Sequence, residues 1–319
     1  MTFDGPCHAT RMSWRCSSSL DVVARPTYRS IDLHSDYQAA RYKSVIHRLP
    51  SLLVAADEIH ADVNASNRRE TLLVYVSAYV AGAKLLTKLG AGDMAALAAD
   101  RAAMTAGSTE SLVSQGMAIY QVVCALLRAD RTDEGEQLAI RMAERLTSHV
   151  RSDAPSVVSV TGALWLIAAV IAARRTDRGA SWERLDTAER LAGLLGRDGN
   201  FAWTAFGPTN VAIHRVSVAA ELGNPADALT AATAVDVEGL PQGLHSRRAQ
   251  VHLDLAWAQA QRKRDAEAVL HLLEAERVAP EALRYNVIAR EIVREMLTRA
   301  NRGHTSALQS LATRAGVLE

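Results

Sequence analysis

Aromatic side chains and cysteines are scarce in this 319-residue chain. Aromatic residues make up 5% of it although hydrophobic residues reach 49%, so the apolar content is mostly alanine, leucine and valine. Alanine and leucine are strong helix formers, and this mix favours closely packed helices. The three cysteines, Cys7, Cys16 and Cys124, do not make a disulfide framework, and we expect a reducing, cytoplasmic location.

An excess of charge of either sign is also lacking. The formal net charge is +1, whereas a chain that grips DNA along its length is usually more basic, so direct nucleic-acid binding is not expected. Only four of the 36 basic residues are lysines. No apolar run follows the N-terminal arginines as in a signal peptide. The longest apolar stretch, Val157 to Ala173, is interrupted by polar residues and glycine, so no membrane span is predicted.

No segment alternates apolar and polar residues as a half-buried strand does. Residues 1–34 contain glycine, proline and serine breaks and are predicted to be a poorly ordered leader. From residue 35 to residue 319 the pattern is helical throughout. We predict helices over residues 37–63 (kinked or broken near Pro50), 69–89, 93–106, 111–128, 134–146, 155–174, 180–195, 208–222, 226–234, 246–262, 265–279, 281–300 and 306–315.

These helices alternate in character, which indicates an internal repeat. A long apolar helix is followed by a short charged or glycine-containing turn and then by an alanine-rich amphipathic helix, as in Leu127–Gly135 and again in Glu221–Leu229. The period of roughly 35 to 45 residues is typical of helix-hairpin arrays. Each hairpin leaves an apolar face that only a neighbour can bury, so the sequence predicts an all-α array over residues 35–319.

Three segments carry a resemblance to a known family. Residues 203–229 (WTAFGPTNVAIHRVSVAAELGNPADAL), 247–280 (RRAQVHLDLAWAQAQRKRDAEAVLHLLEAERVAP) and 281–297 (EALRYNVIAREIVREML) resemble the tetratricopeptide-like region of actinobacterial regulators that begin with an XRE-type helix-turn-helix. The likeness extends over roughly residues 40–319. It implies a right-handed superhelical array of tetratricopeptide-like hairpins, with signal or ligand sensing coupled to transcription.

The N-terminal part departs from that family. Residues 1–34 are too short for its five-helix DNA-binding module, so the chain resembles the sensor region of the family without that module. A natural stand-alone relative, a mis-assigned start and a fragment all fit this pattern. Because helix-turn-helix relatives commonly act as dimers, a homodimer is one expectation for the oligomeric state.

Sequence signatures of catalysis are lacking. There is no His-Glu-x-x-His, no Cys-x-x-Cys, no Gly-x-Ser-x-Gly and no phosphate-binding Gly-Lys-Ser/Thr loop, so no catalytic residue, metal or cofactor is predicted. Cys124 lies in the middle of a predicted helix and is interpreted as a buried, inert thiol. Gly207–Pro208 reads as a plain helix start, although the free N–H groups of a first turn can also bind an anion.

The candidate ligand-binding residues lie in or just before the first helices of hairpins. The resemblance implies that these helices line the concave face, where aromatic side chains could form an apolar pocket with a few polar anchors. The alternative is that each tryptophan fills space between repeats and that the polar residues fix packing. The candidates are Trp165, Trp203, Asn210, His214, Trp257, Arg284 and Tyr285.

Three classes of function remain open on the sequence. The first is a regulatory domain that binds a small-molecule or peptide effector on its concave face. The second is a scaffold that binds a partner protein without any small effector, which a smooth groove without an enclosed pocket would favour. The third is an enzyme on a helical repeat, since fold does not determine function.

Overall fold

The computed structural model describes residues 30–61, 68–299 and 306–318, and every regular element among them is a helix. Residues 1–29 of the predicted leader lie outside this part of the chain, and residues 30–34 open a helix over 30–38. The other helices are α2 (Tyr42–Ala61), α3 (Arg68–Leu89), α4 (Gly92–Gly107), α5 (Leu112–Arg128), α6 (Thr132–Thr147), α7 (Pro155–Arg174), α8 (Arg178–Leu195), the 3₁₀ turn η1 (Phe201–Trp203), α9 (Pro208–Glu221), α10 (Pro225–Ala232), α11 (His245–Gln261), α12 (Asp265–Val278), α13 (Ala282–Tyr285), α14 (Val287–Arg299) and α15 (Ser306–Arg314).

Two predicted helices break at places other than those expected. Of the kink or break predicted near Pro50, the break is wrong, because α2 runs through this exposed residue while Leu49 and Leu52 beside it are buried. The break lies instead at residues 39–41, where Ala40 has a φ of 57°. The helix predicted over 281–300 is interrupted at Asn286, whose Oδ1 accepts a hydrogen bond from Ile288 N at 3.0 Å and so starts α14.

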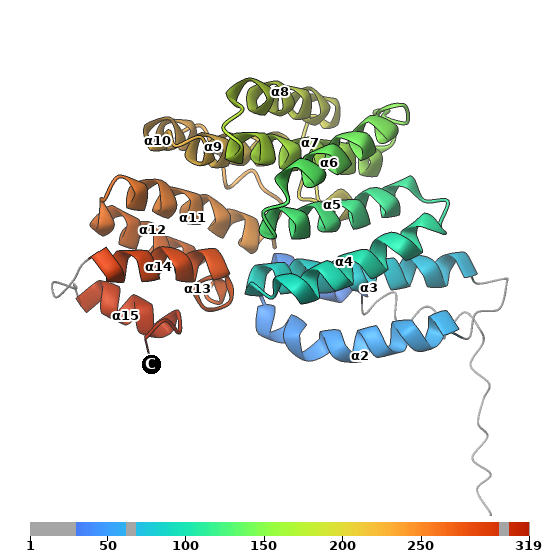
Figure 1. Ribbon diagram of the computed structural model, residues 1–319, viewed down its shortest axis with the longest axis horizontal. Coiled ribbons are helices and arrows are strands. Elements are labelled where there is room, and N and C mark those ends of the chain that lie inside the picture. The colour runs from blue at the N-terminus through green and yellow to red at the C-terminus, as the bar shows by residue number, and fades with distance from the viewer. Residues whose placement is uncertain (1–29, 62–67, 300–305, 319) are drawn as a thin grey trace, which may run out of the picture.

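The helices follow one another as hairpins in two layers (Figure 1). Each of the pairs α3–α4, α5–α6, α7–α8, α9–α10 and α11–α12 packs along its length, and the first helices of successive pairs also contact one another. This arrangement explains their composition, because a first helix has neighbours on several sides. Two of them, α3 and α7, are long and apolar enough to cross a membrane, but 61% and 78% of their most apolar windows are buried inside the structure.

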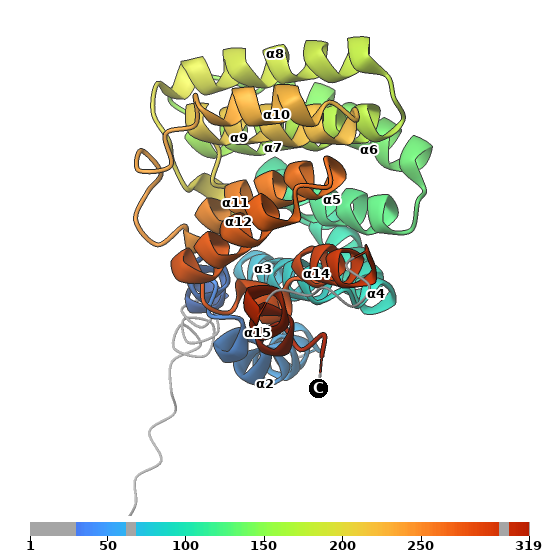
Figure 2. The same ribbon diagram turned by 90° about the vertical axis from the view of Figure 1, so that its left-hand side faces the viewer.

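The two ends of the array meet (Figures 1 and 2). Arg290 Nη2 on α14 donates to the Leu89 carbonyl at the end of α3, at 3.0 Å. Lys43 N on α2 donates to Glu281 Oε2 at 2.8 Å. One hydrophobic cluster joins side chains from the helix over 30–38 and α2–α5 with others from α11–α15. The inner faces of the first helices therefore surround a central space.

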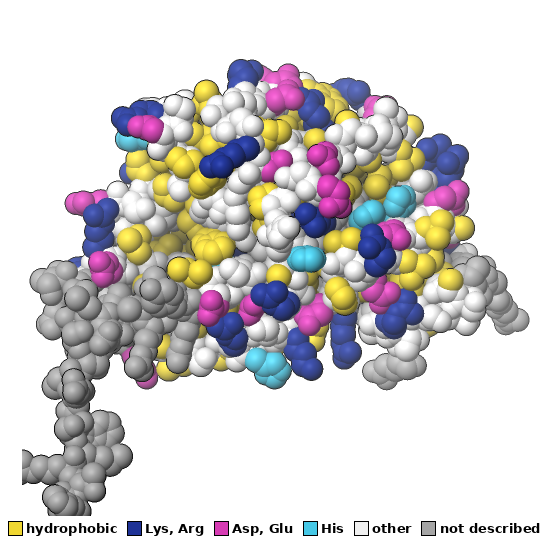
Figure 3. Space-filling model, turned by 180° about the vertical axis from the view of Figure 1, so that it is seen from behind, with side chains coloured by type: hydrophobic (Ala, Val, Ile, Leu, Met, Phe, Trp, Pro, Cys, Tyr) yellow, Lys and Arg dark blue, Asp and Glu magenta, His cyan; other side chains and the backbone are white. Residues whose placement is uncertain are grey.

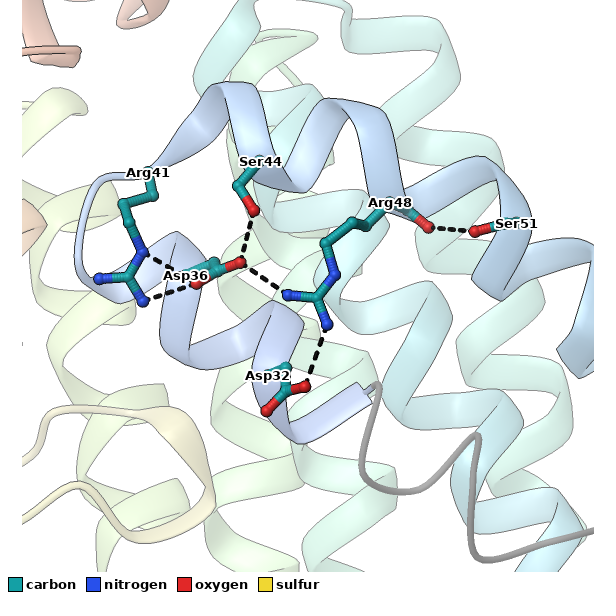
Figure 4. Close-up of polar contacts among 6 residues, drawn as sticks. All are labelled: Asp32, Asp36, Arg41, Ser44, Arg48 and Ser51. Atoms are coloured by element: carbon teal, nitrogen blue, oxygen red, sulfur yellow. Dashed lines mark hydrogen bonds and ion pairs between the residues drawn. The ribbon is translucent and has the colours of Figure 1, made fainter.

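A network of polar side chains fastens the helix over 30–38 to α2 (Figure 4). The carboxylate of Asp36 has 10% side-chain exposure and accepts hydrogen bonds from Arg41, from Ser44 Oγ at 2.7 Å and from Arg48 Nη1 at 2.9 Å. Burial raises the pKa of Asp36, but these hydrogen bonds and the two guanidinium charges outweigh it and lower the pKa below 3.8. The network fixes the position of Tyr37 and Gln38, which face the central space.

Candidate functional site

A cavity of about 190 Å³ lies in the centre of the molecule. Its walls come from six parts of the chain that are far apart in sequence: the helix over 30–38, α3, α5, α7, residues 202–205 and residues 244–250. Most of the lining comes from the first helices of hairpins. The lining residues are Tyr37, Gln38, Val80, Lys84, Thr87, Lys88, Met117, Tyr120, Gln121, Cys124, Val160, Ala163, Ala202, Trp203, Thr204, Ala205, Leu244, Ser246, Arg247 and Gln250.

Cationic side chains dominate the charge of this cavity. Lys84 and Lys88 are one turn apart on α3, and Arg247 lies in the first turns of α11. Burial lowers the pKa of each lysine from 10.5 to about 8, and the charge of Arg247 adds to both drops. Among the described residues that line the cavity, none is Asp or Glu.

Aromatic and neutral polar groups complete the walls. Tyr37 and Tyr120 lie on opposite elements, and burial raises the pKa of Tyr37 to about 12 and also raises that of Tyr120. The Gln121 side chain is 4% exposed and makes no hydrogen bond to any described residue. Burial raises the pKa of Cys124 to about 11, so this thiol stays protonated at neutral pH and is a poor nucleophile. The cavity thus offers flat apolar surfaces together with hydrogen-bond donors.

Residues 197–207, which we call the strap, close one side of the cavity. Three residues of the strap have left-handed backbone conformations, namely Ala202, Trp203 and Ala205, with φ of 48°, 57° and 53°. Such conformations cost a residue other than glycine roughly 1 kcal/mol or more each. The surrounding structure must therefore hold the strap in place.

Hydrogen bonds tie the strap to the helix over 30–38 and to α3. The amides of Gln38 and Asn200 bond reciprocally, at 2.7 and 2.6 Å, and Lys84 Nζ donates to the Trp203 carbonyl at 3.0 Å. The Trp203 ring stacks on His34 with 5.1 Å between ring centroids. Burial and the charge of Lys84 lower the pKa of His34 well below 6.5, so the imidazole is neutral.

The strap is also anchored by packing at its C-terminal end. The buried Phe206 ring lies over Gly162 of α7 so closely that a Cβ at residue 162 would be 2.0 Å from the ring. Next to it, Asp198 Oδ1 accepts a hydrogen bond from Thr209 N at 3.0 Å. The first turn of α9, where an anion-binding alternative was left open, thus receives a carboxylate from the chain itself.

The residues predicted to bind a ligand do not come together in one place. Trp203 lines the central cavity, whereas His214 and Trp257 line an adjoining hollow of about 410 Å³ that shares Arg247 and Gln250 with it. Trp165 borders a separate apolar hollow with Leu191 and Leu194.

Of the other candidates, Asn210 and Tyr285 lie in packed positions and Arg284 does not. Asn210 is 2% exposed, and its carbonyl lies 2.8 Å from His214 Nδ1. Burial lowers the pKa of His214 to about 3, so it is neutral at physiological pH. Tyr285 packs edge-on against Tyr42, with ring centroids 6.4 Å apart, and Arg284 is exposed on the short helix α13.

Sequence reasoning missed the lysines and tyrosines of the cavity. A signal for the lysines was present, because two of only four lysines in an arginine-rich chain lie four residues apart in the apolar C-terminal part of one helix. Residues at this spacing share a face. No local signal marks Tyr37 and Tyr120, which meet only because the array closes.

Comparison with known proteins gives no match to a family model, to a curated protein or to a solved structure. Within the described residues, no group of three or more His, Cys, Asp or Glu side chains is placed to hold a metal ion. The central cavity is therefore the candidate site on its own geometry and chemistry.

Proposed function

We propose that this chain is a regulatory, effector-binding helical repeat and that its effector is a small molecule held in the central cavity. The observation that carries the proposal is the cavity itself, which places polar groups such as Lys88 and Gln121 beside aromatic rings; it is lined by the helix over 30–38, α3, α5, α7, α11 and the strap. Ligand sites in proteins typically combine apolar walls with a few convergent polar groups. Gln121 supports this assignment, because an amide that is 4% exposed normally has a partner.

The closure of the array favours a small effector over a partner protein. A scaffold needs an open groove along its inner face, whereas here Arg290 of α14 bonds to the end of α3, and the strap, which links α8 to α9, covers one side of the cavity. The face of the molecule seen in Figure 3 does not offer a continuous charged patch either. Basic and acidic side chains intermingle over the face seen in Figure 3, which suits neither nucleic acid nor a strongly charged partner.

The tetratricopeptide-like arrangement and the link to transcription are part of the same proposal. Both rest on the resemblance of residues 203–229 and 247–297 to the sensor region of XRE-type regulators. In such an array, a ligand that bridges several first helices would favour one curvature of the stack over another. A ligand can shift such an equilibrium only by its difference in affinity for the two states, and the strained strap is the element best placed to differ between them.

Native mass spectrometry of gently purified protein tests the proposal. We expect a reproducible small adduct on the wild type that is lost in Trp203→Ala and retained in Trp182→Ala. Trp182 is the matched control because it lies on α8, away from the cavity, where Arg215 stacks over its ring. Circular dichroism verifies that both variants fold. An unliganded mass accompanied by a co-purifying protein would overturn the proposal in favour of a scaffold.

A further inference from the structure

The central cavity holds more positive charge than its own side chains can neutralise. Lys84, Lys88 and Arg247 all line it, and none of them forms an ion pair with any residue in the described ranges. The charge of Arg247 is felt by both lysines, so the three cations are close enough to repel one another. Bringing like charges together inside a protein is unfavourable unless an anion joins them.

Carboxylates are found only beyond the cavity lining: Glu221, Asp254, Glu291 and Glu295 line the adjoining hollow, which shares Arg247 with the cavity. Asp254 on α11 attracts Lys88, but it lies outside the cavity lining. Its Oδ1 accepts from Gln250 Nε2 at 2.7 Å, and Ser217 Oγ donates to its other oxygen. Burial raises the pKa of Asp254, although the hydrogen bonds from Ser217 and Gln250 act in the opposite direction. The cavity therefore keeps a net positive character.

Other groups point to a ligand rather than to an empty cluster of charges. Gln121, a residue that is 4% exposed, makes no hydrogen bond to any described residue and lines the cavity from α5. Lys84 donates one of its three hydrogens, to the Trp203 carbonyl, which leaves two for a ligand. Aromatic surfaces from Tyr37 and Tyr120 lie in the same cavity.

We infer that the cavity binds a small organic anion: an apolar, ring-sized body that carries one carboxylate, sulfonate or phosphate group. The acidic group lies among Lys84, Lys88 and Arg247 with the Gln121 amide beside it, and the body lies against the tyrosines and Trp203. This inference rests on the proposed function and adds the chemical class of the effector. Lysine suits this role because its compact ammonium group needs no planar partner.

Two dyes that differ by one sulfonate group separate the claim that the cavity binds a ligand from the claim that the ligand is an anion. 8-Anilinonaphthalene-1-sulfonate is an aromatic anion, and N-phenyl-1-naphthylamine is the same ring system without the sulfonate. We expect the wild type to bind one equivalent of the anionic dye at least about tenfold more tightly than the neutral one, because a charge-assisted contact in a desolvated site has that value. Binding of both dyes should be lost in Trp203→Ala.

The charge-removing variant is Lys84→Met/Lys88→Met. It should lose the preference for the anionic dye and keep its affinity for the neutral dye, which also reports that the cavity is intact. Lys84→Gln/Lys88→Gln must show the same loss. The matched control is Lys43→Met/Lys263→Met, which removes the other two lysines of the chain, both exposed, and should bind like the wild type.

The possible results are distinguishable. Equal wild-type affinity for the two dyes, or an anion preference that survives both lysine variants, overturns the inference while leaving a ligand cavity in place. If the wild type binds neither dye, or if Trp203→Ala binds both dyes as the wild type does, the proposed function itself is contradicted.

Discussion

Replacing Lys84 by methionine should stabilise the unliganded protein. The drop of the Lys84 pKa from 10.5 to about 8 means that burial disfavours the charged form by roughly 3 kcal/mol at pH 7. This value is an upper limit, because the amine faces the cavity and stays partly exposed. The hydrogen bond to the Trp203 carbonyl at 3.0 Å returns about 1.5 kcal/mol. We therefore expect Lys84→Met to raise the free energy of unfolding by about 1 kcal/mol.

The pH dependence gives this prediction its sign. Below pH 8 the lysine is charged in both the folded and the unfolded chain, so the folded wild type carries the full penalty. Between pH 8 and 10.5 the lysine loses its proton in the folded chain but keeps it in the unfolded chain. The free energy of unfolding of the wild type therefore rises with pH in this range. The advantage of Lys84→Met should be complete at pH 7 and smaller at pH 9.5.

Urea denaturation at the two pH values measures this difference, with Lys43→Met as the exposed control expected to change stability by less than about 0.5 kcal/mol. A Lys84→Met variant that is less stable than the wild type by 1 kcal/mol at pH 7 would refute the reasoning, since the lysine would then be a structural element rather than a ligand-binding one. Agreement would identify Lys84 as a residue kept at the expense of stability.

Three further predictions concern the strap, the N-terminal network and the thiol. Gly162→Ala should destabilise the fold by about 3 kcal/mol through overpacking, whereas a Cβ at Gly193 meets nothing within 4 Å, so Gly193→Ala should stabilise the fold slightly. Chemical denaturation measures both changes, and equal changes in stability for the two variants would contradict the packing of Phe206 on Gly162. Asp36→Asn should lower the free energy of unfolding by about 2 kcal/mol, whereas Asp32→Asn, which changes a carboxylate that is 59% exposed, should leave it almost unchanged. The stability that Asp36 contributes should be present above pH 3.8 and lost as the pH falls through its lowered pKa. Urea midpoints that fall equally for the wild type and Asp36→Asn between pH 5 and 3 would argue against the network. Cys124, studied with the other two cysteines replaced by serine, should react slowly with a disulfide reagent at pH 7 and about tenfold faster for each pH increment up to about 11. A rate at pH 7 like that of a free thiol would contradict the raised pKa of this partly exposed thiol.

Local patterns in the sequence predict most of the helices. Their ends at Leu89, Arg128 and Arg174 agree with the structure, because charged or glycine turns follow long apolar runs there. Pro50 misled the prediction because proline disfavours a helix interior, yet burial of Leu49 and Leu52 on the same helix outweighs the lost hydrogen bond. Asn286 could have been recognised, since asparagine is a preferred N-cap residue.

The site was harder to predict because it depends on long-range contacts. The hydrogen bond from Arg290 to the Leu89 carbonyl joins residues 201 positions apart, and no local signal announces such a pair. Because the sequence gives no sign that the two ends of the array meet, the tryptophans were the candidates for an apolar pocket on a concave face. The structure distributes them over three hollows, and it is the lysines of α3 that face the enclosed cavity.

A crystal structure of the wild type with 8-anilinonaphthalene-1-sulfonate tests the central claim most directly. The account predicts one dye molecule in the central cavity, with its sulfonate about 3 Å from the ammonium groups of Lys84 and Lys88 and its rings against Tyr120 and Trp203. A dye bound instead in the outer apolar hollow beside Trp165 and Leu194, with the central cavity unchanged, would contradict it.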